Sequence, residues 1–552
     1  MHRRDTALVF AAFAALYAGA PSPTPSPSAS PAPSASPAPT ASSTLIFPSA
    51  APSPPPLPTP TPAIATPPPI VVSPESASVP VGSPLDLTVG SAISPIAATV
   101  ADPSIASVAV DQTSQRVTIT GKAPGVTVVT ISDARGLRRD VPVRVAYYAG
   151  VIAPHVSLSL TGDPASGEFV REQVARDVKA AAQPRAGAQV LVGPDDVPFR
   201  RALEQDNVAS FDVPVLLQGN GLFEVDGSTH VEVQNVAVPR ISPGSLMVSD
   251  YPERLTANGM LFTADLTIEQ PSRFLYFHYN PPGQPNRRIV LRAENPSHEP
   301  AIVQFISGSG GPSSNEMDVG HQATRRFLVN VVQNQGRLLT LPANSSTQIV
   351  AQDLPAGGIV CGLLQLRVLS GASVHLSLFA QNDDESPDAV VDGSALLQGQ
   401  EQHARGIYPI AEFHFASQWR VDDEQYLELP VGQLPLPNNL QGQALAGDYG
   451  VLQSFVVNLE NPTGAPAQVA IYENPRGGRA TGTYLIDGVL VQSHQVPPFS
   501  RYKVRQYTVP AHGFVRVTIV TMPEAGSSLP LRLIFAPDDG SVSPGAPGSP
   551  IY

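Results

Sequence analysis

Between Ile70 and Tyr147 the chain consists of short runs in which apolar residues occupy every second position. Because successive side chains of a strand point to opposite faces, each run predicts a strand with one buried face. Turn-forming pairs such as Val81-Gly82 and Asp102-Pro103 separate the runs, at the spacing typical of a small antiparallel β-sandwich. The alternating apolar positions include Leu85, Leu87, Val89, Val108, Val110, Val117, Ile119, Val129, Ile131, Val141, Val143 and Val145.

One stretch of this region resembles known domains. The segment DPSIASVAVDQTSQRVTITGKAPGVTVVTISD, which begins at Asp102, resembles the bacterial Ig-like group-2 (BIG2-like) domain. It is also loosely similar to the N-terminal domain of pilus-formation secretins. The most specific piece is Gly121-Lys122-Ala123-Pro124-Gly125-Val126-Thr127, a turn that leads into a strand. The resemblance is confined to residues 70–147 and implies an Ig-like fold, without implying an activity.

The next region, residues 148–243, has a different pattern. Phe169, Val170, Val174 and Val178 recur at helical spacing, and we expect this helix to end before Pro184. Strand-like runs VPVLLQG, GLFEV and THVEVQNVAV follow. The pattern therefore predicts a small α/β module, with one helix packed on a sheet.

Residues 244–382 and 402–540 contain related segments, which indicates a duplication. Glu294-Asn295-Pro296 recurs as Glu460-Asn461-Pro462, and Gly358 aligns with Gly513 in a second, ungapped block. Strand patterns such as RFLYFHY and FVVNLEN fill both copies, so we expect each copy to be an all-β sandwich. If the copies superpose, Pro296 should lie on Pro462 and Gly358 on Gly513.

The ends of the chain differ from this globular part. His2, Arg3 and Arg4 precede a short apolar run, as in a secretory signal peptide, here predicted for residues 1–20. Residues 21–69 are mostly Pro, Ser, Ala and Thr, which cannot bury a core. This linker is either a spacer or a ligand for a proline-reading domain. Residues 383–401 form a polar connector, and residues 541–552 a disordered tail.

The predicted fold class is therefore mainly β and multidomain. In chain order the predicted parts are a signal peptide (1–20), a disordered Pro-rich linker (21–69), an Ig-like β-sandwich (70–147), a small α/β module (148–243), a β-sandwich (244–382), a connector (383–401), a second β-sandwich (402–540) and a disordered tail (541–552).

The net charge and the cysteine content limit the kinds of partner and of covalent crosslink that the chain can have. The formal net charge is −13, so polyanions such as nucleic acid would be repelled. Cys361 is the one cysteine, and no intramolecular disulfide can form. We expect a secreted, periplasmic or cell-surface protein with no transmembrane span in the mature chain, bound to an envelope protein or a glycan that the sequence does not identify.

The residues that usually carry catalysis are scattered. The 11 histidines show no metal-ligand spacing, and acidic clusters such as Asp422-Asp423-Glu424 lack the alternation of a calcium loop. Ser307-Gly308-Ser309-Gly310-Gly311 lacks the order of a nucleophile elbow, and we interpret it as a turn after a strand. The sequence thus predicts no enzyme, no cofactor, no metal site and no catalytic residue.

Aromatic clusters leave one candidate for ligand binding. Tyr276 and Tyr279 in the first copy and Trp419 in the second could stack on sugar rings if they are exposed. Alternation along a strand would instead bury about half of each cluster in a core. Both interpretations remain open from the sequence.

A comparison of the two copies predicts which surface is covered. Ile359, Cys361 and Leu363 align with Phe514, Arg516 and Thr518, and both copies are apolar at the alternate positions that should face the core. Leaving large apolar side chains in water costs roughly 1.5–3 kcal/mol each. We therefore expect a neighbouring domain or a longer loop to cover the Cys361 face, and the Arg516 face to be open.

These observations favour an exported, non-catalytic structural or interaction protein of the cell envelope, of the adhesion or scaffold type. A carbohydrate-binding module array is the alternative, and a secreted hydrolase is a weaker one.

Overall fold

The computed structural model describes residues 67–268, 270–386, 395–400, 403–440 and 443–540. The predicted signal peptide, nearly all of the predicted linker and the predicted tail lie outside these residues. From Pro68 onward the chain forms one compact unit. Strands dominate the described residues, and α1 and α2 are their two α-helices. The prediction of a mainly β fold is confirmed.

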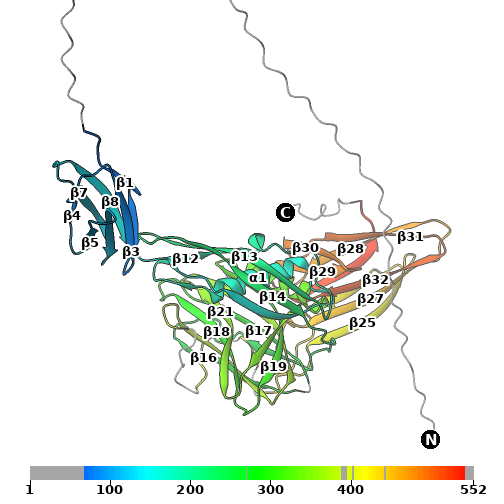
Figure 1. Ribbon diagram of the computed structural model, residues 1–552. Helices are drawn as coiled ribbons and strands as arrows, with labels where there is room; N and C mark the ends of the chain where they lie inside the picture. The colour runs from blue at the N-terminus through cyan, green and yellow to red at the C-terminus, as the bar shows by residue number, and fades with distance from the viewer. Residues whose placement is uncertain (1–66, 269, 387–394, 401–402, 441–442, 541–552) are drawn as a thin grey trace, which may run out of the picture. The chain divides into compact units, whose positions relative to one another are not determined.

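Eight strands form the predicted Ig-like sandwich (Figure 1). Their hydrogen-bonded orders are β1-β3-β6-β5 in one sheet and β2-β8-β7-β4 in the other. The alternating residues Leu87, Val117, Ile119, Val129 and Val143 are buried between the sheets, as the pattern predicts. The strands are β1 (Val71–Ser73), β2 (Ala77–Pro80), β3 (Pro84–Gly90), β4 (Ala97–Val100), β5 (Ala106–Asp111), β6 (Arg116–Gly121), β7 (Gly125–Ser132) and β8 (Arg138–Ala146).

The α/β module contains the predicted helix, α1 (Gly167–Ala181). Ser166 caps its N-terminus, and its apolar face, which includes Phe169, Val174 and Val178, packs on a sheet. Residues 221–224, expected within a strand, precede β14 as a turn and a single bridge. The other elements are β9 (Gly150–Val151), β10 (His155–Thr161), β11 (Gln183–Pro184), β12 (Ala188–Leu191), the 3-10 helix η1 (Pro194–Asp196), β13 (Val208–Gly219) and β14 (Val225–Asn235).

The sheet of this module does not end at the module. Strand β10 pairs antiparallel with β20 (Gly336–Leu341), so one sheet runs through ten strands in the order β12-β13-β14-β10-β20-β19-β22-β17-β15-β24. The boundary that the sequence placed near residue 243 therefore lies between strands of a continuous sheet.

The first sandwich, as we call the part from β15 to β24, packs part of this long sheet against a second sheet of order β16-β23-β18-β21. Its elements are β15 (Ser245–Ser249), β16 (Gly259–Leu266), β17 (Ser272–Tyr279), β18 (Arg287–Asn295), β19 (Ala301–Ser313), α2 (Glu316–Val332), β20, β21 (Ser345–Leu354), β22 (Ile359–Ser370), β23 (Val374–Asn382) and β24 (Arg405–Tyr408).

The second sandwich runs from β25 to β33 and packs a sheet of order β25-β27-β32-β29-β30 on one of order β26-β33-β28-β31. Its strands are β25 (Glu412–Arg420), β26 (Leu427–Val431), β27 (Leu452–Asn461), β28 (Ala467–Pro475), β29 (Ala480–Ile486), β30 (Val489–Val496), β31 (Tyr502–Val509), β32 (Gly513–Thr521) and β33 (Leu531–Pro537).

The two sandwiches have the same pairing pattern. The order β15-β17-β22-β19-β20 corresponds to β25-β27-β32-β29-β30, including the parallel first pair, and β16-β23-β18-β21 corresponds to β26-β33-β28-β31. In this correspondence Gly358 directly precedes β22, and Gly513 is the first residue of the equivalent strand β32. The shared topology supports a duplication.

The predicted pairing of Pro296 with Pro462 is wrong. Asn295 ends β18, whereas Asn461 ends β27, and these strands occupy different sheets of their sandwiches. The equivalent of Asn461 is Asn280, since each donates a side-chain N–H to the last carbonyl of the equivalent strand, Val509 or Leu354. The equivalent of Asn295 is Asn474 at the end of β28.

Helix α2 is an element that the sequence interpretation missed, so the expectation of an all-β first copy is wrong. It lies between β19 and β20, where the second sandwich has only the tight Asp487-Gly488 turn. Ser307 to Gly311, expected as a turn, continue strand β19 beneath it. A Cβ atom on Gly308 would lie 2.2 Å from the backbone N of Phe327, so these glycines permit the close approach of α2.

Helix α2 also covers the face that the sequence predicted to be covered. Cys361 and Leu363 are buried in one cluster with Phe327 and Leu328 of α2 and with residues of the second sandwich such as Met522. In the second sandwich Phe514 is 69% exposed, and Arg516 and Thr518 are also exposed. The predicted contrast between the two faces is confirmed.

Candidate binding cleft

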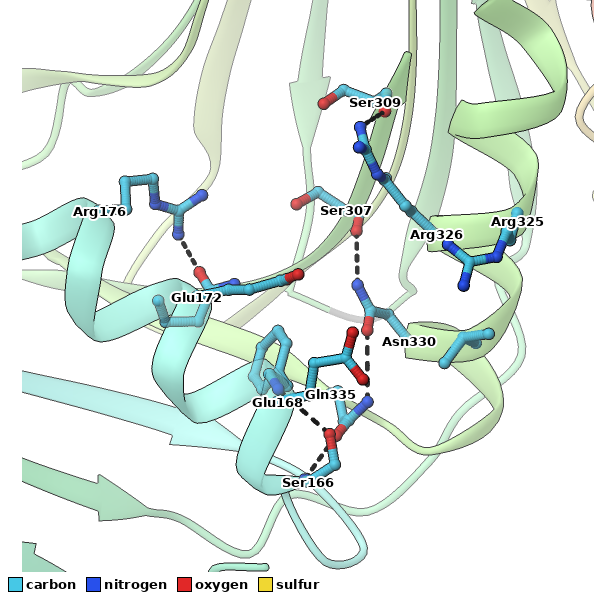
Figure 2. Close-up of a pocket in the computed structure, with 14 residues that line it drawn as sticks. Ser166, Glu168, Glu172, Arg176, Ser307, Ser309, Arg325, Arg326, Asn330 and Gln335 are labelled. Atoms are coloured by element: carbon cyan, nitrogen blue, oxygen red, sulfur yellow. Dashed lines mark hydrogen bonds between the residues drawn. The ribbon is translucent and has the colours of Figure 1, made fainter. Parts of the chain in front are cut away.

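A polar cleft lies between α1 and α2, with β19 as its floor (Figure 2). Its volume is about 450 Å³, within the range of small-molecule sites. Its lining is more polar than apolar and combines hydroxyl, amide and charged groups. The residues are Ser166, Glu168, Phe169, Glu172, Gln173, Arg176, Ser307, Gly308, Ser309, Arg325, Arg326, Val329, Asn330 and Gln335.

A chain of hydrogen bonds holds the two walls of the cleft together at one end. The Gln335 side-chain oxygen accepts from the backbone N–H of Ser166 at 2.6 Å. The Gln335 side-chain nitrogen donates to the Asn330 oxygen at 3.3 Å, as Figure 2 shows. Ser166 is the N-cap of α1 and Asn330 lies in the last turn of α2, so this network fixes the spacing between the helices.

Two side chains of α2 form hydrogen bonds with backbone carbonyls at the edge of β19, the strand at the base of the cleft. The Asn330 nitrogen donates to the Ser307 carbonyl at 2.9 Å, and the Arg326 guanidinium donates to the Ser309 carbonyl at 2.6 Å (Figure 2). Strand β20 pairs with β19 only as far as Phe305. Asn330 and Arg326 therefore satisfy backbone groups that a neighbouring strand satisfies in the second sandwich.

The cleft carries charges of both signs. Arg325 and Arg326 project from α2, and Glu168, Glu172 and Arg176 from α1. Partial burial and the nearby carboxylate of Glu168 raise the pKa of Glu172. Loss of solvation and the neighbouring Arg337 guanidinium lower the pKa of Arg176 to about 10, which still leaves Arg176 charged at neutral pH.

A second hollow adjoins the cleft around Arg176 and Ser307 to Ser309, which line both. Its volume is about 500 Å³, and Gln348, Gln352 and Tyr276 contribute to its walls. The two together form a continuous hollow along β19 that is lined by both polar and apolar residues. Groups of these types suit a ligand with several hydroxyl, amide or charged groups.

A buried charge pair joins the two sandwiches. Arg273 of β17 is fully buried and donates to Glu412 of β25 at 2.9 Å and to the Ala411 carbonyl at 2.5 Å. Its guanidinium also donates to Gln365 at 3.1 Å. Burial lowers the pKa of Arg273, and the Glu412 carboxylate opposes that shift. Removing either partner would leave a desolvated charge in the junction.

A second buried polar cluster links α2 to the second sandwich. The Nδ1 atom of His321 lies 3.0 Å from a carboxylate oxygen of Glu524. The other carboxylate oxygen of Glu524 accepts a hydrogen bond from the Thr483 hydroxyl at 2.6 Å. Burial disfavours the charged form of His321, but the Glu524 carboxylate outweighs it and the pKa of His321 is raised. The other ring nitrogen of His321 lies 3.1 Å from the Gln492 oxygen. The Gln492 amide, which cannot act as a nucleophile, thus lies on the ring nitrogen where a catalytic triad would place its nucleophile.

The aromatic residues selected from the sequence lie apart from this cleft or beneath its surface. Tyr276 is fully buried and donates its hydroxyl to Gln352 at 2.8 Å. Trp419 is buried and donates to the Gln425 carbonyl at 2.9 Å. Tyr279 is half-buried, with the Arg254 guanidinium 5.4 Å from its ring centroid. Tyr276 and Trp419 thus have no open face for a sugar, because the sheets that carry them are covered there.

The sequence interpretation missed Arg325, Arg326 and Asn330 because it missed α2. The signal was present: Val319, Ala323 and Phe327 recur at helical spacing after a capping residue, Asn315. Among the described residues no group of three His, Cys, Asp or Glu side chains could hold a metal ion. Within the same residues no helix has the length and apolarity needed to cross a membrane.

Comparison with known families gives one match. Residues 74–146 match the model of the pilus formation protein N-terminal region. These residues are the Ig-like sandwich, so the resemblance to pilus-formation secretin N-terminal domains is confirmed for this part of the chain. No curated protein sequence matches the chain.

Solved structures give only distant likenesses. The human desmocollin-1 ectodomain is 11% identical with a TM-score of 0.13, and the match covers 36% of this chain and 45% of that one. The Bacteroides ovatus mixed-linkage glucan utilization locus protein SGBP-B is 10% identical, with a TM-score of 0.13 and coverage of 55% and 71%. A structure of carbohydrate-binding modules from the β-sandwich superfamily is 12% identical, with a TM-score of 0.11 and coverage of 56% and 94%. Scores this low carry no functional argument.

Proposed function

We propose that this chain is an exported, non-catalytic interaction protein of the cell envelope. In this proposal the Ig-like sandwich attaches the chain to an envelope assembly, and the two joined sandwiches act as a scaffold. The observation that carries the proposal is the match of residues 74–146 to the pilus formation protein N-terminal region. The buried Arg273–Glu412 pair supports the scaffold part, because it fixes one sandwich on the other.

Two polar clusters of the described residues, the one around His321 and the cleft between α1 and α2, support the non-catalytic part. His321 is the buried histidine with a carboxylate partner at the sandwich junction, and Gln492 occupies its second nitrogen. The cleft between α1 and α2 contains Ser307 and Ser309 without a histidine among its lining residues. A serine nucleophile needs a base within hydrogen-bond reach.

Site-specific photo-crosslinking tests the attachment. Val126 on β7 is 73% exposed and Val129 on the same strand is fully buried. A photoreactive residue at position 126 should give one defined adduct with an envelope protein in intact cells, whereas position 129 should give none. Recovery of the chain in the cytoplasm, or no adduct from position 126 in the envelope fraction, would contradict the proposal.

A carbohydrate ligand is the second candidate, and the polar cleft is the observation that favours it. Because Trp419 is a core residue, a Trp419→Ala variant would test folding rather than binding. The informative variant is Arg325→Ala with Arg326→Ala, and Arg516→Ala on the open face of the second sandwich is its control. Glycan-array binding that the cleft variant abolishes and the control retains would establish this role. Equal binding by both variants would exclude the cleft.

A further inference from the structure

Strand β25 lies at the edge of its sheet, and no strand of the described part of the chain pairs with its outer side. Within the described residues β27 is its one pairing partner, along all nine residues from Glu412 to Arg420. His414, Ala416, Gln418 and Arg420 are exposed along it. An open edge presents unpaired backbone N–H and C=O groups, and proteins usually block such edges with proline, lysine or a bulge. The segment EFHFASQWR contains neither proline nor lysine, and its register with β27 is unbroken.

The first sandwich shows what covers the equivalent edge. Its counterpart of β25 is β15, and β24 pairs antiparallel with the outer side of β15, with Leu246 opposite Tyr408 and Ser249 opposite Arg405. Four of the five residues of β15 are buried. The same fold therefore accepts an antiparallel strand at this position.

The sequence of β25 can pair with a second copy of itself in an antiparallel register that opposes no like charges. With Ala416 on the two-fold axis, Glu412 of one chain lies opposite Arg420 of the other, and His414 lies opposite Gln418. Glu412 and Arg420 are each paired within their own chain, with Arg273 and Asp422, so no two unpaired like charges face each other in this register. Such a pairing uses the same surface on both chains, as a two-fold dimer requires.

We propose that β25 is a dimerisation edge, at which a second copy of this chain adds its own β25 antiparallel, centred on Ala416. The two five-stranded sheets then join into one continuous sheet across the two-fold axis. The inward residues Phe413, Phe415 and Trp419 continue to pack in the cores of their own chains. The proposal goes beyond the proposed envelope function and does not depend on it.

A charge-swap experiment on the full chain tests the register. Ala416→Lys places two ammonium groups opposite each other, and Ala416→Glu places two carboxylates there, so each variant should be a monomer by analytical ultracentrifugation. A mixture of the two should dimerise again. Thr518→Lys, on the exposed face of the central strand β32, is the matched control and should remain a dimer like the unchanged chain. A monomeric unchanged chain, or an Ala416→Lys variant that remains a dimer, would overturn the proposal.

Cysteine crosslinking gives a second test, which does not depend on affinity. The Cα atoms of directly opposed residues in antiparallel strands are about 4.5–5.5 Å apart, within the range that a disulfide spans. The native thiol of Cys361 is buried and does not interfere. Ala416→Cys should therefore form a covalent dimer on oxidation, and Thr518→Cys should not.

The crosslink also fixes the alignment of the strands. Gln418→Cys alone should remain uncrosslinked, because the two copies of residue 418 would be about 13 Å apart, but it should crosslink when mixed with His414→Cys. Covalent dimers from Gln418→Cys alone, at the rate of Ala416→Cys, would refute the register.

Discussion

The first and second sandwiches share a strand order and differ in what surrounds them. In the first, β10 and β24 pair with the two edges of the larger sheet, and α2 covers its outer face. In the second, no strand of the described residues pairs with the outer side of β25, and Arg516 and Thr518 are in solvent. The outer face of the larger sheet is therefore apolar in the first sandwich, where an inserted helix covers it, and polar in the second sandwich, where it is in solvent.

Equivalent positions also differ in buried charge. Glu294 and Glu473 directly precede equivalent asparagines, Asn295 at the end of β18 and Asn474 one residue before the end of β28. Glu294 is exposed, whereas Glu473 is fully buried and accepts a hydrogen bond from Ser493. Burial raises the pKa of Glu473 to about 7. The second sandwich therefore has an ionisable carboxyl group in its interior, whereas the equivalent carboxyl group of the first sandwich is in water.

Thiol labelling should give the largest contrast between the two outer faces. In an Arg516→Cys variant, Cys361 should react at least about a thousandfold more slowly than the new thiol, because a buried site opens only with a free energy of about 4 kcal/mol or more. Peptide mapping of the labelled native protein measures both rates in one sample. Rates within tenfold of each other would disprove the covered face, and equal rates after unfolding are the control.

Breaking the junction should cost several kcal/mol. Arg273→Met leaves Glu412 as a desolvated charge between the sandwiches, and we expect unfolding to become easier by about 3–5 kcal/mol. Arg516→Met, on the open face, should change the unfolding free energy by less than about 0.5 kcal/mol. Urea denaturation followed by circular dichroism compares them. Glu412→Gln added to Arg273→Met should recover part of the loss, and a purely additive double variant would contradict direct coupling.

The stability of the second sandwich should fall as pH rises. Folding favours the neutral form of Glu473, because its pKa is about 7 in the folded protein against an ordinary 4.5. The contribution of this group to the free energy of unfolding is therefore complete below about pH 4.5 and is lost as pH rises through 7. The expected loss is about 3 kcal/mol. The urea midpoint of the Glu473→Gln variant should change little between pH 4 and pH 8, whereas that of the Glu294→Gln control should still fall as pH rises. An unchanged slope in Glu473→Gln would refute the assignment.

A smaller effect should follow from tightening the contact under α2. A Cβ on Gly310 would lie 2.0 Å from the Val319 carbonyl oxygen, so Gly310→Ala should cost about 1–3 kcal/mol by displacing the helix. Ser309→Ala, one residue away with an exposed side chain, should cost under about 0.5 kcal/mol. Thermal unfolding measures both. A tolerated Gly310→Ala would show that α2 can shift away from β19 at little cost.

Alternation and helical spacing identified the elements whose two faces differ in burial. The Ig-like strands, α1 and the contrast around Cys361 follow from such patterns, because one face of each is in a core and the other is not. Strand β17 is nearly all buried, since the sandwich core covers one face and α2 with the second sandwich covers the other. Alternation therefore could not predict that Tyr276 would be a core residue.

The register of the duplication could not be obtained from local motifs. Asn280, Asn295, Asn461 and Asn474 each precede a proline at or next to the end of a strand, and each donates to the backbone carbonyl of a residue that is distant in the sequence. Each sandwich contains two such asparagine–proline sites, so the sequence around a non-equivalent pair of sites is as similar as the sequence around an equivalent pair. Only the pairing of the strands distinguishes the two alignments. Helix α2 was missed for a related reason, because its end, FLVNVV, has the composition of a strand.

The pairing of β10 with β20 also affects the order in which the chain can fold. Residues Ser159 to Thr161 find their partners at Gly336 to Leu338, so an emerging chain must wait for much of the first sandwich before this sheet edge is closed. During that interval the outer edge of β10 is exposed to other strands. A fragment that ends near residue 243 would keep that edge open permanently. Expression fragments of this protein should therefore extend beyond Leu341, the end of β20.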